Sequence, residues 1–325
     1  MREIQVGTAQ FEARDGDKAY NLGVIETLSR RAAGLGAGLV CFHECSISGY
    51  TWLETLARQE FFETGELVPG GPSTGRLIAI ARDAGIAIGA GLIESAGDRR
   101  YNCFVVVSPD GFVARHRKLH DFIHPDISNG DAYTVFDLAG CRFGILTCYD
   151  NNLPENARVT AMMGAEILLA PHVTGCLPSP APGRGTVARE VWKNRHHDPV
   201  RCRMEFDGPK GRGWLLKWLP ARGWENGVYL VYANVIGIDG GTVKPGGSMI
   251  IDPYGEIVAE CRTLDDEVVV ATLVPENLEL ASGSSYIRAR RPELYGKLVE
   301  ANPALGANKQ PEVYWKKIRE KAHAS

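Results

Sequence analysis

Cys148 ends an apolar run and comes just before a segment that suits the start of a helix. Residues 141–148 read CRFGILTC, and Pro154 and Glu155 follow after a short polar stretch. Proline at the first helical position gives up no hydrogen bond, and an acid there complements the helix dipole. Cys148 would therefore lie at the carboxyl end of a strand near a helix N terminus, where ligands gather and a thiolate is stabilised. This position suits a nucleophile, and it also suits a buried thiol that fills a strand end.

Glu44 is an acid at the end of another apolar run, GLVCFHE at residues 38–44. A carboxylate there is costly to bury without a role or a partner. Glu44 could act as a general base, or it could face solvent where the strand ends. Its position alone leaves both interpretations open.

Lys118 is one of three arginine or lysine residues in FVARHRKLHDF, residues 112–122. A basic run at the end of a strand is usually a solvated edge. A lysine near a carboxylate and a cysteine would instead supply positive charge where an oxyanion develops. Taken alone, the run does not decide between these interpretations.

These three residues must be positioned by an alternation of strands and helices. Helical spacing of apolar residues predicts helices at 18–34, 74–83, 153–163 and about 208–226. Many of the predicted strands are apolar on both faces, as in a sheet covered on one side by helices and on the other by a second sheet. The pattern predicts an α/β sandwich with two sheets face to face and helices outside. The predicted strands are 3–11, 38–44, 85–94, 102–109, 141–148, 165–171, 227–237, 247–253 and 267–273.

Two segments interrupt this alternation. Residues 119–134 are polar, contain proline and glycine, and are predicted to be a loop. Residues 174–213 form a charged insertion that is rich in proline and glycine. A loop of that length inside a compact domain is usually functional or disordered.

The composition excludes several classes of protein. The net charge of −3 over 325 residues shows no excess of basic residues that would bind nucleic acid or an anionic membrane. No run of roughly 18 uncharged apolar residues suggests a membrane-spanning helix, and the first residues, MREIQVGTAQF, do not resemble a signal peptide. We therefore expect a cytoplasmic protein.

The eight cysteines form no CxxC pair, so neither a zinc module nor a disulfide framework is expected. His116 and His120 are four residues apart in a segment of strand and loop, where that spacing does not bring them to one face. We expect no metal site.

Taken in order, the segments FHE at Glu44, RKLH at Lys118 and GILTCYDNNLPENAR around Cys148 resemble the three signature segments of the nitrilase superfamily, the carbon–nitrogen hydrolases. The resemblance covers about residues 3–296. Further segments fit the same family: SGY (48–50), YNCFVVVSPDG (101–111), GAEILLAP (164–171), RGWENGVYLVYANVIG (222–237), GGSMIIDPYGEIVAE (246–260) and RRPELYG (290–296).

The resemblance implies a fold and a mechanism. The fold is a four-layer αββα sandwich, paired with a second copy into an αββα–αββα homodimer or a higher oligomer. Glu44, Lys118 and Cys148 would form a catalytic triad, in which the thiol attacks the carbon and the glutamate takes its proton. Lys118 and the backbone N–H of Tyr149 would stabilise the oxyanion, and no cofactor would be required.

The family also suggests how the chain is divided. We expect a hydrolase domain over residues 1–300, which includes the insertion, and a C-terminal tail at 301–325 that contacts a second subunit. Pairing in the family uses the helices that follow the glutamate and cysteine segments. In this chain those would be 52–62 and 153–163, and both carry more apolar residues than a solvated helix needs.

One feature departs from the family pattern. Members commonly carry a second glutamate between the lysine and the cysteine, whereas residues 119–147 contain none. Asp121, His124 and Asp126 lie in the corresponding loop, and Asp126 is the candidate we choose for that role. Tyr50 and His172 are further candidates for substrate binding.

Tyr149 and Asp150, directly after the cysteine, are typical of amidase-like members. The sequence therefore favours hydrolysis of a small amide to a carboxylic acid and ammonia or an amine. A nitrilase and an N-carbamoyl amidohydrolase are the alternatives, and a catalytically silent binding protein with this fold is a further one.

Overall fold

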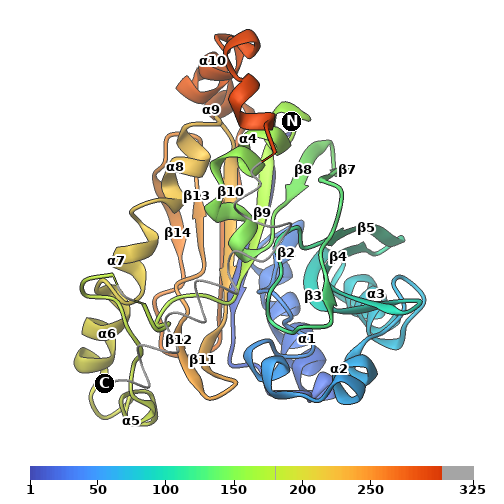
Figure 1. The fold of residues 1–325 in the computed structure, drawn as a ribbon, viewed down its shortest axis with the longest axis vertical. Coiled ribbons are helices and arrows are strands. Elements are labelled where there is room, and N and C mark those ends of the chain that lie inside the picture. Colours follow the sequence, from blue (N-terminus) through green and yellow to red (C-terminus); the bar gives the residue numbers. More distant parts are fainter. Residues whose placement is uncertain (180, 302–325) are drawn as a thin grey trace.

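The computed structural model describes residues 1–179 and 181–301, and within them two mixed sheets lie face to face (Figure 1). The first sheet runs in the order β15 (Glu267–Leu273), β1 (Ile4–Gln10), β2 (Leu39–Cys41), β3 (Ala87–Ala96), β4 (Arg99–Ser108) and β5 (Gly111–Arg117), with β6 (Ile127–Ser128) beside β4. The second runs β14 (Ile257–Glu260), β13 (Met249–Ile251), β10 (Tyr229–Asn234), β9 (Ile167–His172), β8 (Cys141–Ile145) and β7 (Thr134–Leu138). A hairpin of β11 (Ile236–Asp239) and β12 (Thr242–Pro245) follows β10.

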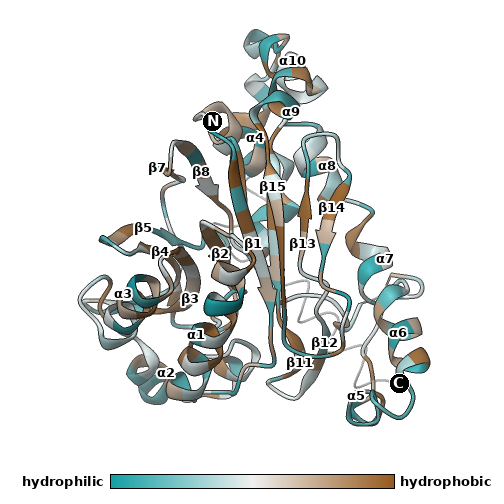
Figure 2. Ribbon diagram, turned by 180° about the vertical axis from the view of Figure 1, so that it is seen from behind, coloured by the Kyte–Doolittle hydropathy of each residue, from teal (hydrophilic) through white to brown (hydrophobic). Residues whose placement is uncertain are grey.

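The centre of each sheet is parallel and buried on both faces. In β2, Val40 packs into the cluster beneath the helices, while Leu39 and Cys41 pack between the sheets. In β10, Leu230 faces the helices and Val231 faces the opposite sheet. Such strands need a cover on both sides, which is why the predicted strands read as continuous apolar runs. Figure 2 shows hydrophobic residues along β1, β13 and β15, whereas helix α1 carries residues of both kinds.

Helices close the outer face of each sheet. The first sheet is covered by α1 (Lys18–Gly34) and α3 (Pro72–Ala84), whose buried Leu22, Ile25, Leu28, Leu77 and Ile80 belong to one apolar cluster. The second sheet is covered by α4 (Pro154–Met162) and α8 (Leu219–Trp224). Three apolar layers thus separate four structural layers, and the predicted αββα sandwich is confirmed.

The remaining helices are short. The predicted helix at 52–62 divides into a 3-10 turn, η1 (Thr51–Thr55), and α2 (Arg58–Thr64). The predicted helix at 208–226 divides into α7 (Arg212–Leu215) and α8, with Pro220 in the first turn of α8. The chain continues through α9 (Pro275–Leu280), α10 (Ser282–Arg288), η3 (Pro292–Leu294) and η4 (Gly296–Val299). Of the predicted tail at 301–325, residues 302–325 fall outside the described residues.

The insertion at 174–213 is ordered where it is described. It contains α5 (Arg189–Lys193) and α6 (Pro199–Asp207), which lie beside the β11–β12 hairpin (Figure 1). Trp192 is buried there and stacks on Phe206, with ring centres 5.9 Å apart. Both belong to one cluster with Cys176 and Val243, so the insertion has a small core of its own.

No helix among residues 1–179 and 181–301 is long and apolar enough to cross a membrane.

Candidate active site

The backbone turns sharply at Cys148, where β8 has ended and the 3-10 turn η2 (Cys148–Asn152) begins. Cys148 has φ of +50°, in the left-handed region that costs a non-glycine residue free energy. The turn lifts the thiol out of the strand, and Cys148 is half-buried while the other seven cysteines are buried. As a residue, Cys148 is therefore the least buried of the eight cysteines.

Glu44 lies next to this thiol and is completely buried. Its Oε1 accepts hydrogen bonds from Lys118 Nζ and Asn102 Nδ2, each at 2.7 Å. Its Oε2 accepts the backbone N–H of Val173 at 3.1 Å, and the carbonyl of Val173 lies 3.9 Å from Cys148 Sγ. Val173, just after β9, therefore connects the carboxylate with the thiol.

Lys118 is also completely buried, just after β5. Its Nζ lies 3.5 Å from Asp121 Oδ2 and donates to the Tyr50 hydroxyl at 3.3 Å, in addition to its ion pair with Glu44. Burial lowers the pKa of Lys118, but the charges of Asp121 and Glu44 more than offset this and hold it well above its ordinary value. Lys118 therefore carries a positive charge at neutral pH.

Burial and neighbouring charges both act on the pKa of the Cys148 thiol and on that of the Glu44 carboxylate. Burial and the nearby charge of Glu44 raise the pKa of the Cys148 thiol far above its ordinary value, and Lys118 offsets only part of this. Burial also raises the pKa of Glu44, while Lys118 and Asn102 oppose the rise. The thiol is therefore neutral at pH 7, and Glu44, which pairs with Lys118, lies within hydrogen-bonding reach of its proton.

Asp150 joins the lysine segment to the cysteine turn. Its carboxylate accepts the backbone N–H groups of Leu119 at 3.1 Å, His120 at 2.9 Å and Thr147 at 3.2 Å, and the His120 ring at 3.0 Å. Burial raises the pKa of Asp150, but hydrogen bonds from His116 and His120 hold it well below the usual range. The ionised carboxylate therefore fixes the distance between two segments that are far apart in the sequence.

The aspartate beside Lys118 is Asp121, whereas the candidate chosen from the sequence was Asp126. Asp126 forms an ion pair with Arg58 at 3.2 Å, and its side chain is 34% exposed. Asp121 is buried, and its Oδ2 accepts Asn102 Nδ2 at 2.7 Å. Asn102 thus holds Asp121 and Glu44 on the two sides of Lys118. Sequence reasoning missed Asn102, although an amide inside the apolar strand NCFVVVS was a signal.

The other candidates surround this cluster. The hydroxyl of Tyr50 contacts Lys118, and the ring of Tyr149 meets that of Phe122 edge-on, with centres 5.6 Å apart. His172 is buried at the end of β9, with Nδ1 2.8 Å from the carbonyl of Ala170. Burial lowers the pKa of His172 to about 4, so the ring is neutral at pH 7. Its Nε2 has no hydrogen-bond partner among residues 1–179 and 181–301.

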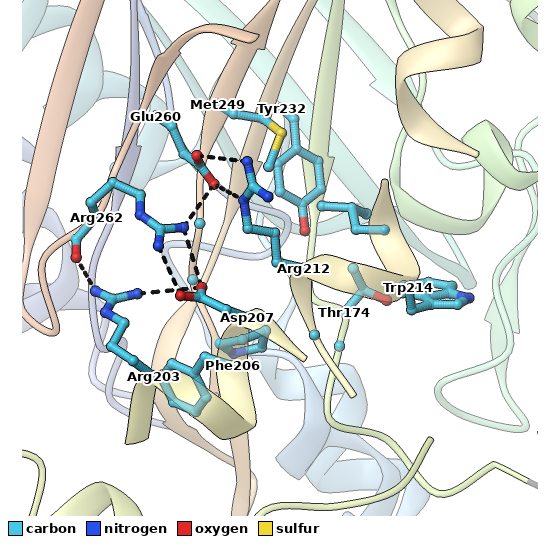
Figure 3. A pocket seen from close by; sticks show the side chains of 16 residues that line it. Thr174, Arg203, Phe206, Asp207, Arg212, Trp214, Tyr232, Met249, Glu260 and Arg262 are labelled. Carbon is cyan, nitrogen blue, oxygen red and sulfur yellow. Dashed lines mark hydrogen bonds and ion pairs between the residues drawn. The ribbon is translucent and has the colours of Figure 1, made fainter. Parts of the chain in front are cut away.

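None of the residues of this cluster is among those that line the pocket in Figure 3. It reaches the site through Thr174, which follows Val173, and through Tyr232, whose ring centre is 4.8 Å from that of His172. Its far wall is a network in which Arg212 pairs with Glu260 at 2.7 Å and Arg262 pairs with Asp207 at 2.8 Å. Because these charges pair with one another, the network serves to hold the insertion against β14.

Comparison with known proteins gives the family. Residues 5–282 match the model of the family described as carbon-nitrogen hydrolase. A nitrilase from Pyrococcus abyssi is 30% identical over 298 residues, which cover 90% of this chain and 99% of the relative. An (R)-stereoselective amidase from Pseudomonas sp is 30% identical over 302 residues, covering 91% of this chain and 95% of the relative.

Solved structures share the fold. The amidase from Nesterenkonia sp. AN1, as a double mutant in complex with acrylamide, superposes with a TM-score of 0.68 at 23% identity, covering 91% of this chain and 97% of that one. A single mutant of the same amidase, in which acrylamide has added to the active-site cysteine, gives a TM-score of 0.67 at 24% identity. Since the family model spans most of the chain and two relatives reach 30% identity over nine-tenths of it, this chain belongs to the carbon–nitrogen hydrolases of the nitrilase superfamily.

Proposed function

We propose that the protein hydrolyses the C–N bond of a small amide through an acyl-enzyme on Cys148, releasing a carboxylic acid and ammonia or an amine. The observation that carries the proposal is the buried hydrogen-bonded cluster of Glu44, Lys118 and the Val173 peptide beside the thiol. A base, a cation and a nucleophile that come from three separate segments meet in this cluster.

In the first step, Cys148 Sγ attacks the amide carbon and forms a C–S bond. The thiol proton passes to Glu44, because the thiol has a raised pKa and needs a base at the moment of attack. The negative charge that develops on the amide oxygen is stabilised by Lys118 and by the backbone N–H of Tyr149. Glu44 then gives its proton to the leaving nitrogen as the C–N bond breaks.

In the second step, water replaces the leaving group. Glu44, again a carboxylate, takes a proton from water, whose oxygen attacks the thioester carbon. The C–S bond breaks, the thiolate recovers a proton from Glu44, and the carboxylic acid leaves. Lys118 keeps its charge while Glu44 holds a proton, because the carboxylate of Asp121 still lies beside it.

An amide is favoured over a nitrile by Tyr149 and Asp150 after the cysteine, and one of the relatives is an amidase. A relative of equal identity is a nitrilase, and N-carbamoylputrescine amidase from Arabidopsis thaliana is 28% identical over 315 residues. Nitrile and N-carbamoyl substrates are therefore the second candidates. Both would be attacked by the same thiol.

A panel of amides, nitriles and N-carbamoyl compounds, scored for ammonia release, tests the proposal. We expect amides to react fastest, and hydroxylamine to divert the acyl group to a hydroxamate. Cys148→Ala should abolish release, whereas Cys45→Ala should leave it largely intact. Release by folded Cys148→Ala would overturn the proposal, and a complete lack of reaction in the wild type would favour a silent binding protein.

A further inference from the structure

Lys244 is a second buried lysine near the proposed site. It lies in β12 with only 1% of its surface exposed. Neither an ion pair nor a side-chain hydrogen bond of Lys244 is found within residues 1–179 and 181–301. A buried ammonium without a partner is costly, so this lysine requires an explanation that packing does not supply.

The strand pattern separates Lys244 from the apolar side of its hairpin. Val243 packs with Cys176 and Trp192 in the core of the insertion, and Ile238, opposite Val243 in the register, packs there too. Because successive side chains of a strand point to opposite faces, Lys244 and Asp239 share the other face. The hairpin therefore presents an apolar side to the insertion and a charged side to the rest of the molecule.

Two sets of hydrogen bonds attach this hairpin to the proposed active site. Asp239 accepts the backbone N–H of Tyr50 at 3.1 Å and the N–H and hydroxyl of Thr51. Asn234 accepts the N–H of Thr174 at 3.0 Å and donates to the carbonyl of Gly246 at 3.0 Å. These bonds join the residues on both sides of the hairpin to Tyr50, which contacts Lys118, and to the segment after β9, which contacts Cys148.

The charges around Lys244 do not complete its environment. Burial lowers its pKa, and Asp239, Cys176, Cys148 and Glu54 raise it by smaller amounts, so that the net shift is downward. Asp239 already accepts hydrogen bonds from Tyr50 and Thr51 and is not within ion-pair distance of Lys244. Cys148 is among the groups that act on Lys244, so the buried ammonium is within electrostatic range of the proposed nucleophile, and its charge is only partly compensated.

We propose that Lys244 binds a carboxylate on the substrate, so that the preferred substrates are small amides that also carry a carboxylate group. This inference rests on the proposed function and narrows its substrate class. A lysine that merely balances Asp239 within the fold is the alternative, and it predicts no dependence on the charge of the substrate.

Matched pairs of substrates test the inference. Malonamate, succinamate and glutaramate would each be compared with the neutral amide in which an isopropyl group replaces the carboxylate. Wild-type protein should prefer one of the anionic amides in kcat/KM. Lys244→Met should reduce the ratio of anionic to neutral kcat/KM by about 10- to 100-fold, mainly through KM, because one charge-assisted hydrogen bond is lost. Lys193→Met, an exposed lysine of α5, should leave that ratio unchanged.

A binding experiment gives a result even without turnover. Malonate, succinate and glutarate would be titrated by calorimetry into Cys148→Ala, with and without Lys244→Met, after thermal unfolding has shown that each variant is folded. Binding that weakens at least tenfold in the double variant supports the role of Lys244. Equal affinities, no binding of any diacid, or a ratio of kcat/KM that does not change would overturn it. Turnover through Cys148 is measured separately, so any of these outcomes would contradict the role of Lys244 without contradicting the proposed function.

Discussion

The buried cluster around Lys118 is electrostatically unusual, because one ammonium lies between two carboxylates and all three are shielded from water. Removing one member of such a cluster leaves a buried charge uncompensated. Such a substitution should therefore lower activity more than a substitution at the surface does. The roles proposed for Glu44, Asn102 and Asp121 can therefore be separated by single substitutions.

Asp121→Asn should lower kcat by about 10- to 100-fold with the fold retained, because a small displacement of Lys118 costs transition-state stabilisation. Asp126→Asn should remain near wild-type activity, since Asp126 pairs with Arg58 near the surface. Steady-state kinetics on the best amide measures both. Equal losses in the two variants would contradict the role assigned to Asp121.

The pH dependence of kcat/KM should report the ionisation of Glu44. Activity needs the carboxylate form, so kcat/KM should rise with pH through the pKa of Glu44, which lies above the ordinary value. Asn102→Leu should shift this acid limb to higher pH, because the amide hydrogen bond favours the charged form. Asn194→Leu, at an exposed position, is the control. A limb that stays in place in Asn102→Leu would contradict the assignment of Glu44 as the base.

From the sequence we named the three triad candidates and Tyr50, but we missed Asn102 and chose Asp126 over Asp121, for a physical reason. Glu44, Lys118 and Cys148 occupy motifs whose local pattern is characteristic. The contact between Asn102 and Asp121 forms only when the fold brings β4 beside the loop after β5, and no local pattern reports such a contact. Asp121 and Asp126 lie in the same polar loop, so the sequence does not tell them apart. In the fold Asp121 is buried, whereas Asp126 is partly exposed.

At the level of elements, the strands were easier to predict than their ends. Strands buried on both faces read as apolar runs, and each predicted strand overlaps a strand of the structure. The run at 38–44 forms a strand only at Leu39–Cys41, because the chain then turns to bring Glu44 into the site. The β11–β12 hairpin was missed, although Gly240 and Gly241 between two apolar runs are a turn signal.

Asp150→Asn should destabilise the fold by about 2–4 kcal/mol at pH 7, since it weakens the acceptor for several buried donors. The pKa of Asp150 is lowered in the folded protein, so its carboxylate contributes stability above the ordinary carboxyl pKa. That contribution is lost as pH falls through the lowered pKa, and the difference from wild type should shrink in strong acid. Urea unfolding at several pH values measures it, with Asp137→Asn at an exposed ion pair as the control. A variant as stable as wild type at pH 7 would contradict the linking role of Asp150.

At the level of the whole molecule, apolar side chains are exposed at one end of the sandwich, where α4, α8, α9 and α10 gather (Figure 1). Met162 and Met163 at the end of α4 are 47% and 43% exposed. Trp224 is 46% exposed and meets the ring of Tyr286, with centres 5.6 Å apart. Exposed apolar side chains that gather at one end mark interfaces, and we propose that this end pairs with a second copy.

Sedimentation at micromolar concentration should therefore give at least a homodimer. Met163→Glu should weaken the association by placing a charge in the contact. Met204→Glu should have no effect, because Met204 is exposed on α6 within the insertion, away from α4. A 35.4 kDa species alone, from wild-type protein, would exclude pairing through this end.

The central claim is that Cys148 carries the acyl group during turnover. The direct measurement is rapid acid quenching of the protein during turnover of its best amide, followed by peptide mass spectrometry of all eight cysteines. We predict an added mass equal to the acyl group on the peptide that contains Cys148, absent in Cys148→Ala and diminished in Glu44→Gln. An acyl group on another cysteine, or turnover by folded Cys148→Ala, would contradict the account.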